Sequence, residues 1–113
     1  MNTTAIAKYK KQARIIKALA HPTRLFIVDE LARGERSVRE LTDMIGVEMP
    51  TVSRHLSVLR NAGILVDDKR GLQVFYSLRV PCVLNFFKCV EAVQRDDGRL
   101  PKRNLVPEMC CVA

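Results

Sequence analysis

Residues 37–63 read SVRELTDMIGVEMPTVSRHLSVLRNAG, and this stretch decides the fold. Ser37 followed three residues later by Glu40 is a capping box, which predicts the start of a short helix, and Gly46 ends it. After a three-residue turn, a proline at the first helical position predicts a second helix over residues 50–61. Two short helices joined by a tight turn predict a helix-turn-helix.

A β-hairpin is expected directly after the second helix. Two strand-like runs, 64–67 and 72–77, flank a charged turn at 68–71. Lys69 and Arg70 are expected at the tip of the hairpin. A helix-turn-helix followed by a basic hairpin is typical of a winged helix, so the expected fold class is mainly α with a small β-hairpin.

Three further helices complete the expected architecture. Apolar residues at three- and four-residue steps predict helices over 4–20, 23–33 and 80–95. In the helix over 23–33 the positions expected to face inward are Leu25, Val28, Leu31 and Ala32. We expect one domain over residues 1–95, followed by a flexible tail over 96–113 that carries two cysteines.

The second helix of the helix-turn-helix has two chemically different faces. Val52, Leu56 and Leu59 form an inward stripe, and short hydroxyls and arginines lie on the other side. Hydroxyls suit phosphate contacts, and Arg54 is the best candidate for reading a guanine edge. His55 lies between the faces, which favours a half-buried packing role or a phosphate contact. An ordinary solvated helix face remains the alternative. The residues expected to contact DNA are Pro50, Thr51, Ser53, Arg54, Ser57, Arg60, Lys69 and Arg70.

The charge balance also favours nucleic acid. The 113 residues carry a formal net charge of +7, although a charge of this size could serve solubility alone. No apolar run is long enough to span a membrane and no signal peptide is evident, so a cytoplasmic protein without a membrane partner is expected.

Two motifs resemble those of the ArsR/SmtB family of winged-helix repressors. These are ALAHPTRL at residues 18–25 and TVSRHLSVLRNAG at residues 51–63, and the resemblance covers about residues 5–95. It implies a homodimer, a palindromic DNA target, and release of DNA when a metal or metalloid ion binds. In this comparison the recognition helix corresponds to residues 50–61 and the wing to residues 67–71.

The last predicted helix supports dimerisation independently. It carries two apolar stripes, and a helix that is hydrophobic on two sides in so small a domain favours a subunit interface, formed by the first and last helices, over a central core helix. The stripes are Val80, Val83, Leu84, Phe87 and Val90 on one side, and Cys82, Phe86, Cys89 and Val93 on the other.

Two metal sites that are usual in the resembled family are not expected here. Ser37 and Arg39 occupy the positions of its paired cysteines, and an arginine cannot bind a cation. No histidine follows residue 55, which excludes the second site on the last helix.

The cysteines provide another possible sensor. Cys82 and Cys89 are about 10.5 Å apart along a helix, too far to share an ion whose thiolate ligands lie within about 4.6 Å of each other. Cys110 and Cys111 are adjacent, and Cys89 is the better third ligand, with Cys82 as a variant. We therefore expect a site for As(III) or Sb(III) at Cys89, Cys110 and Cys111, one per subunit, as inducer; no cofactor is required. The tail could reach the helix of its own subunit or of the partner.

Three alternatives remain open. A thiol redox or persulfide sensor of the same fold would release DNA on oxidation, and a ligand-independent winged helix would not respond to any ligand. An enzyme is the weakest reading, because the sequence has neither a phosphate-binding glycine loop nor a Cys–His pair with the spacing of a nucleophile.

Overall fold

A computed structural model describes residues 2–95 of the chain. The predicted tail, with Cys110 and Cys111, lies outside the described residues. The chain divides into two compact units, the first ending at Arg79 and the second beginning at Val80. Each unit is described by itself below.

Two helices open the first unit. Helix α1 (Thr3–Leu19) is capped by the Asn2 side chain and is buried only at Ala18 and Leu19. Helix α2 (Pro22–Leu31) begins where His21 Nδ1 accepts a hydrogen bond from the Thr23 backbone N–H. Both helices match the prediction to within one or two residues at their ends.

The predicted inward face of α2 is partly wrong. Leu25 is 41% exposed and Ala32 is exposed, while Ile27 is completely buried. Val28 and Leu31 are buried as expected. The reason is that the core lies against the face that carries Ile27 and Leu31, which are four residues apart and therefore on one side of the helix.

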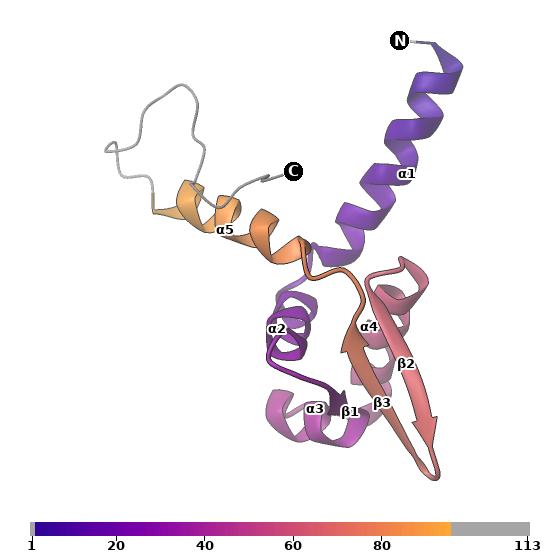
Figure 1. The fold of residues 1–113 in the computed structure, drawn as a ribbon, viewed down its shortest axis with the longest axis vertical. Helices are drawn as coiled ribbons and strands as arrows, with labels where there is room; N and C mark the ends of the chain where they lie inside the picture. The colour runs from indigo at the N-terminus through magenta and orange to yellow at the C-terminus, as the bar shows by residue number, and fades with distance from the viewer. Residues whose placement is uncertain (1, 96–113) are drawn as a thin grey trace. The chain divides into compact units, whose positions relative to one another are not determined.

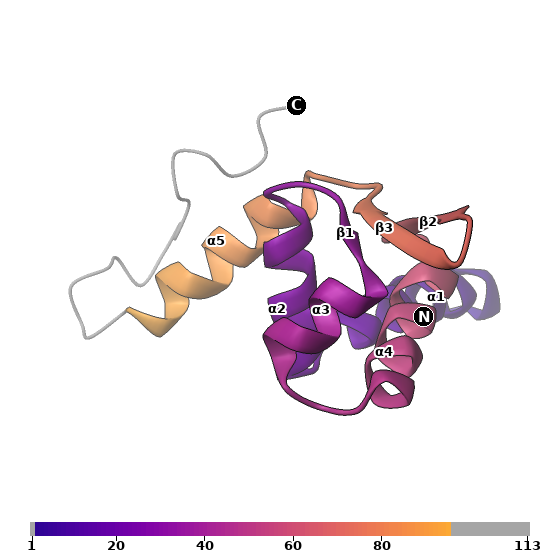
Figure 2. The ribbon, with the colours of Figure 1, turned by 90° about the horizontal axis from the view of Figure 1, so that it is seen from below.

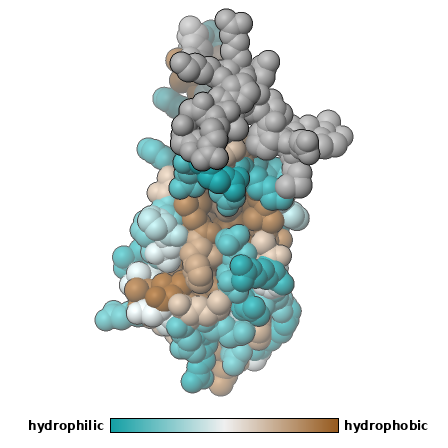
Figure 3. Space-filling view, turned by 90° about the vertical axis from the view of Figure 1, so that its left-hand side faces the viewer, coloured by the Kyte–Doolittle hydropathy of each residue, from teal (hydrophilic) through white to brown (hydrophobic). Residues whose placement is uncertain are grey.

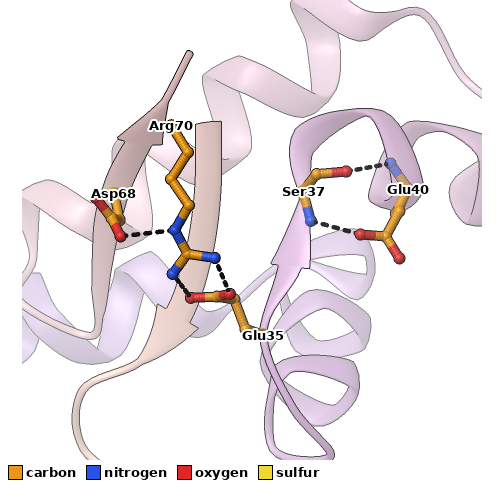
Figure 4. A network of polar contacts seen from close by, with 5 residues as sticks. All are labelled: Glu35, Ser37, Glu40, Asp68 and Arg70. Atoms are coloured by element: carbon orange, nitrogen blue, oxygen red, sulfur yellow. Dashed lines mark hydrogen bonds and ion pairs between the residues drawn. The ribbon is translucent and has the colours of Figure 1, made fainter. Parts of the chain in front are cut away.

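The helix-turn-helix is confirmed in detail. Helix α3 (Val38–Ile45) starts with the predicted capping box, in which Glu40 N–H donates to Ser37 Oγ at 3.1 Å and Ser37 N–H donates to Glu40 Oε1 at 3.0 Å (Figure 4). Gly46 ends it with φ of 79°, a left-handed conformation that suits glycine. Helix α4 (Met49–Asn61) begins one residue earlier than predicted, with the proline in its first turn.

The sheet has three strands where a two-stranded hairpin was predicted. Strands β2 (Leu65–Arg70) and β3 (Gln73–Leu78) pair antiparallel, and the short strand β1 (Arg36–Ser37), which was not predicted, pairs with the other edge of β3. Figures 1 and 2 show β3 between β1 and β2.

The hairpin is longer than expected and its turn is shorter. Arg70 pairs with Gln73, so only Gly71 and Leu72 form the turn, and Gly71 has a φ of 62°. Lys69 and Arg70 therefore lie in β2, not in the turn. Their strand pairing continues because the charged side chains of an exposed strand need no burial to maintain the ladder.

The core of the first unit brings together side chains from all its helices and from β2 and β3. Its largest completely buried members lie on α2, α3, α4 and the start of the hairpin, and they hold α4 against α3 and β2. These are Ile27, Val28, Leu41, Val52, Leu56, Leu59, Ile64 and Leu65.

The second unit contains helix α5 (Val83–Gln94), which starts three residues later than predicted. Val80 and Cys82, which were assigned to its two apolar stripes, precede the helix, and Cys82 is its N-cap residue. The delay has a cause in Pro81, because a residue that precedes a proline avoids the helical conformation. None of the residues of α5 is buried.

Apolar side chains remain exposed in both units. Phe26 on α2 is 40% exposed, and Val93 on α5 is 59% exposed. Figure 3 shows apolar surface between hydrophilic side chains on one face of the molecule. No helix in the described part of the chain is long and apolar enough to cross a membrane.

Candidate nucleic-acid interface

Helix α4 separates a buried stripe from an open polar face, as the sequence predicted. Val52, Leu56 and Leu59 are completely buried. Arg54 is exposed, and no carboxylate among the described residues lies within 4 Å of its guanidinium group. The remaining predicted contacts on α4 are also reachable: Pro50 and Arg60 are exposed, and Thr51, Ser53 and Ser57 are half-buried. The face is thus fixed by the core and presents an unpaired cation.

A hollow of about 470 Å³ lies between the start of α3, the start of α4 and the hairpin. Ser53 from α4 and Gln73 from β3 line it, together with Arg39 from the first turn of α3. Arg39 and Gln73 were not among the predicted contact residues. Arg39 could have been predicted as a contact residue, because the first helix of a helix-turn-helix crosses the DNA backbone. The position of Gln73 depends on the hairpin turn, which was predicted at residues 68–71 and lies at Gly71 and Leu72.

Arg70 on the hairpin is held by two carboxylates (Figure 4). Its Nη1 and Nη2 donate to the two oxygens of Glu35 at 2.7 and 2.8 Å, and its Nε donates to Asp68 at 2.9 Å. These hydrogen bonds, first those that Arg70 donates to Glu35, raise the pKa of Arg70. The guanidinium group also lies 4.6 Å from the centre of the Phe75 ring. The positive charge of Arg70 is therefore balanced within the protein.

Arg60, at the end of α4, is also paired. Its Nη1 lies 3.1 Å from Asp67 Oδ2, and both side chains are about 40% exposed. Lys69, in contrast, has no carboxylate within 4 Å among the described residues. Three predicted contact residues with the same formal charge thus differ in how freely they can meet an anion.

His55 links α4 to the start of α2. Its Nδ1 accepts a hydrogen bond from Arg24 Nε at 3.2 Å, and its ring centre lies 4.4 Å from that of His21. Burial, then the charges of His21, Arg24 and Arg54, lower the pKa of His55. The side chain is half-buried, as predicted, and a neutral imidazole fits its role as an acceptor.

The predicted cysteine site lies only partly within the described residues. Cys89 is half-buried on α5, and Cys82 is exposed at its N-cap. The prediction that these two cysteines share one stripe of the helix is therefore wrong. Cys110 and Cys111 fall outside residues 2–95. Within that range no three His, Cys, Asp or Glu side chains are grouped so that they could hold a metal ion.

Comparison with known proteins gives matches over the same elements. Residues 21–66 match the family model described as "Bacterial regulatory protein, arsR family". The biofilm growth-associated repressor of Xylella fastidiosa is 46% identical over 66 residues, which are 58% of each chain, so the match spans little more than half of that relative. An uncharacterized HTH-type transcriptional regulator of Methanocaldococcus jannaschii is 39% identical over 85 residues, which are 74% of this chain and 96% of the relative.

Solved structures agree with the fold. The transcriptional repressor BigR from Xylella fastidiosa is 34% identical with a TM-score of 0.66, over 82% of this chain and 96% of that one. A homodimeric winged helix-turn-helix DNA-binding domain from Mycobacterium bovis is 30% identical with a TM-score of 0.73, over 87% and 91%. The winged helix-turn-helix and these matches together show that the chain belongs to the ArsR family of bacterial regulatory proteins.

Proposed function

We propose that this protein is a transcriptional repressor that binds operator DNA as a homodimer in the cytoplasm. The observation that carries the proposal is Arg54, which is exposed and has no carboxylate partner among residues 2–95, on a helix whose opposite side is completely buried. The regulators that it resembles, among them repressors, support the same function.

Helix α4 has the dimensions and chemistry of a recognition helix. The major groove of B-DNA is about 12 Å wide and admits an α-helix. Arg54 would make paired hydrogen bonds to guanine O6 and N7, while Thr51, Ser53 and Ser57 would contact phosphates. Pro50 has no N–H and leaves the first turn open for close approach.

The hollow beside the hairpin would bind the sugar-phosphate backbone of the DNA strand that separates the major groove from the next minor groove. Arg39 would meet the phosphates of this strand, and Lys69 and Leu72 would reach the minor groove from the hairpin. Arg60 and Arg70 can join them only by exchanging a carboxylate for a phosphate, so we assign them a smaller share of the affinity.

Dimerisation would cover the exposed apolar side chains of α1 and α5. Ile6, Tyr9 and Ile16 on α1 are each more than a third exposed, and so are Phe86, Val90 and Val93 on α5. The Mycobacterium bovis structure is described as homodimeric. Two copies would present two α4 helices to a palindromic site.

As inducer we propose As(III) or Sb(III), one per subunit, bound by the thiolates of Cys89, Cys110 and Cys111, with Cys82 as the variant ligand. Three soft thiolates suit these ions. Binding would link α5 to the end of the chain and favour a dimer geometry that fits DNA poorly.

A second candidate signal is thiol oxidation. One structure of similar fold is described as reduced HlyU from Vibrio cholerae, at 27% identity and a TM-score of 0.68. In this alternative, two of the same cysteines would form a disulfide and release the DNA without any metal or metalloid.

DNA binding is tested by selecting binding sequences from a random duplex library and measuring fluorescence anisotropy with the selected duplex. We expect a two-fold symmetric site bound at least a thousandfold more tightly than random DNA. Equal affinity for both duplexes would contradict a repressor function.

The inducer is tested by titrating arsenite into the protein–DNA complex, in the wild type and in the single variants C82S, C89S, C110S and C111S. We expect release that is lost in C89S, C110S and C111S and retained in C82S. Normal responses of C110S and C111S would overturn the metalloid site. Release by oxidant in metal-free buffer, with no effect of arsenite, would favour the redox alternative.

A further inference from the structure

A second hollow lies at the end of α4, whereas the hairpin turn lies beside the start of this helix. It has a volume of about 370 Å³ and opens between α1, the start of α2 and the end of α4. Its polar lining consists of Arg14, Lys17, Arg24 and Asn61, and it contains no acidic residue. Three cations around one hollow form a concentrated positive field.

These three cations have no carboxylate partner in the described part of the chain. Within residues 2–95, no carboxylate lies within 4 Å of Arg14, Lys17 or Arg24. Arg24 is oriented by neutral acceptors, since its Nε donates to His55 Nδ1 at 3.2 Å and its Nη1 to the carbonyl of Ala18 at 3.4 Å. The guanidinium group is thus fixed in place while its charge remains uncompensated.

The position of the hollow relates it to the face of α4. Asn61 lies on the same side of the helix as Arg54 and Ser57, because steps of three and four residues return to one face. Helix α4 has 13 residues and is about 20 Å long, while the major groove is about 12 Å wide. A helix of this length laid across the groove reaches the phosphate strands on both sides.

We propose that this basic hollow binds the DNA phosphate backbone on the strand that borders the major groove at the end of α4, away from the hairpin turn. The inference rests on the proposed DNA-binding function and extends it, because it assigns a backbone contact to α1, outside the helix-turn-helix and the hairpin. The ligand is a run of phosphodiesters, which Arg14 and Lys17 contact and Arg24 helps to position.

The proposed dimer leaves Arg14 accessible. At 100° per residue, the exposed apolar side chains Ile6, Tyr9 and Ile16 centre about 130° around α1 from the direction of Arg14 and about 70° from that of Lys17. Arg14 therefore faces away from the proposed subunit interface, and Lys17 lies beside the edge of that interface.

The test compares two double variants of the full chain with equal loss of charge. Arg14→Gln/Lys17→Gln removes two cations from the hollow, and Lys8→Gln/Arg95→Gln removes two exposed cations elsewhere. Thermal unfolding first establishes that both variants fold. The affinity for the selected operator and for random duplex is then measured from 50 to 300 mM salt.

For Arg14→Gln/Lys17→Gln we expect the slope of log K against log salt to decrease by about 1.8 for each subunit bound, since each phosphate contact contributes about 0.9. Affinity at 0.1 M salt should fall on the order of tenfold per lost contact, equally for both duplexes. The charge-preserving variant Arg14→Lys/Lys17→Arg should keep the wild-type slope. Phosphate ethylation should interfere with wild-type binding on the strand away from the hairpin turn, and this interference should disappear in the hollow variant.

A wild-type slope in Arg14→Gln/Lys17→Gln, or an equal decrease in the Lys8→Gln/Arg95→Gln control, would overturn the proposal while leaving DNA binding itself intact. Absence of any DNA binding by the wild type would instead contradict the proposed function.

Discussion

The two ends of the proposed DNA-binding surface carry similar positive charge but use it differently. Beside the hairpin turn, Arg70 is paired with Glu35 and Asp68, and Arg60 of α4 is paired with Asp67 of β2. On the α1 side, the cations of the basic hollow have no carboxylate partner among the described residues. The number of basic residues in a segment therefore does not measure the positive charge available to DNA. That charge depends on how many of these residues are already paired with carboxylates of the protein.

The largest expected effect comes from the core that supports both ends. Leu56→Ala should lower the free energy of unfolding by about 2–5 kcal/mol, because it leaves a cavity under α4 where Leu56 is completely buried. Chemical denaturation measures the change. If both ends of the proposed DNA-binding surface depend on one rigid helix, this variant weakens the DNA contacts at both ends together. A loss of unfolding free energy below about 1 kcal/mol would show that other contacts hold α4 in place.

The next effect isolates the start of α3. Ser37→Ala removes the side-chain oxygen of the capping box and should cost about 1 kcal/mol of stability. Ser37→Asp, which keeps a capping oxygen, is the matched control. If both variants unfold at the same denaturant concentration as the wild type, the cap contributes nothing to stability. The first turn of α3, which carries Arg39, would then not depend on the cap.

Releasing Arg70 from its partner tests the comparison directly. Glu35→Gln removes one carboxylate that balances Arg70, so affinity for DNA should increase severalfold and the salt slope should become steeper by about 1. Stability should change by less than about 1 kcal/mol because the pair is exposed. Asp29→Asn on α2, with the same change in charge, is the control. An equal gain in both variants would show that net charge, and not the release of Arg70, sets the affinity.

The smallest effect concerns pH. The pKa of His55 in the folded state is lowered from its ordinary value of 6.5, first by burial. The unfolded state therefore binds more protons below pH 6.5, and the stabilisation that is present above this pH is lost as the pH falls toward the lowered pKa. Unfolding between pH 5 and 7.5 should show a weaker pH dependence in His55→Gln, which retains an acceptor for Arg24. Identical pH profiles would contradict this role of His55.

Most of the fold could be predicted from the sequence because its signals are local. The capping box at Ser37, the glycine at Gly46 and the apolar stripe of α4 each act within a few residues. Strand β1 and the true hairpin turn were missed because they depend on the pairing of Arg36 with Tyr76 and of Arg70 with Gln73, which no local pattern encodes.

The same distinction between local and tertiary signals applies to the candidate site. The exposure of Arg54 follows from helical periodicity. The pairing of Arg70 with Glu35, 35 residues away in the sequence, and the convergence of Arg14 and Asn61 on one hollow follow only from tertiary structure. Spacing therefore predicted which residues face outward, and the structure was needed to show which of them are already paired.

Sequence readout by Arg54 is tested by the affinities of Arg54→Ala and Arg70→Ala for the selected operator and for random duplex, compared with the wild type at one salt concentration. We predict that Arg54→Ala loses about 1–3 kcal/mol per half-site of discrimination between the two duplexes. Arg70→Ala should keep that discrimination and bind within about threefold of the wild type, since its charge is already balanced. Loss of discrimination in Arg70→Ala, with none in Arg54→Ala, would contradict the account.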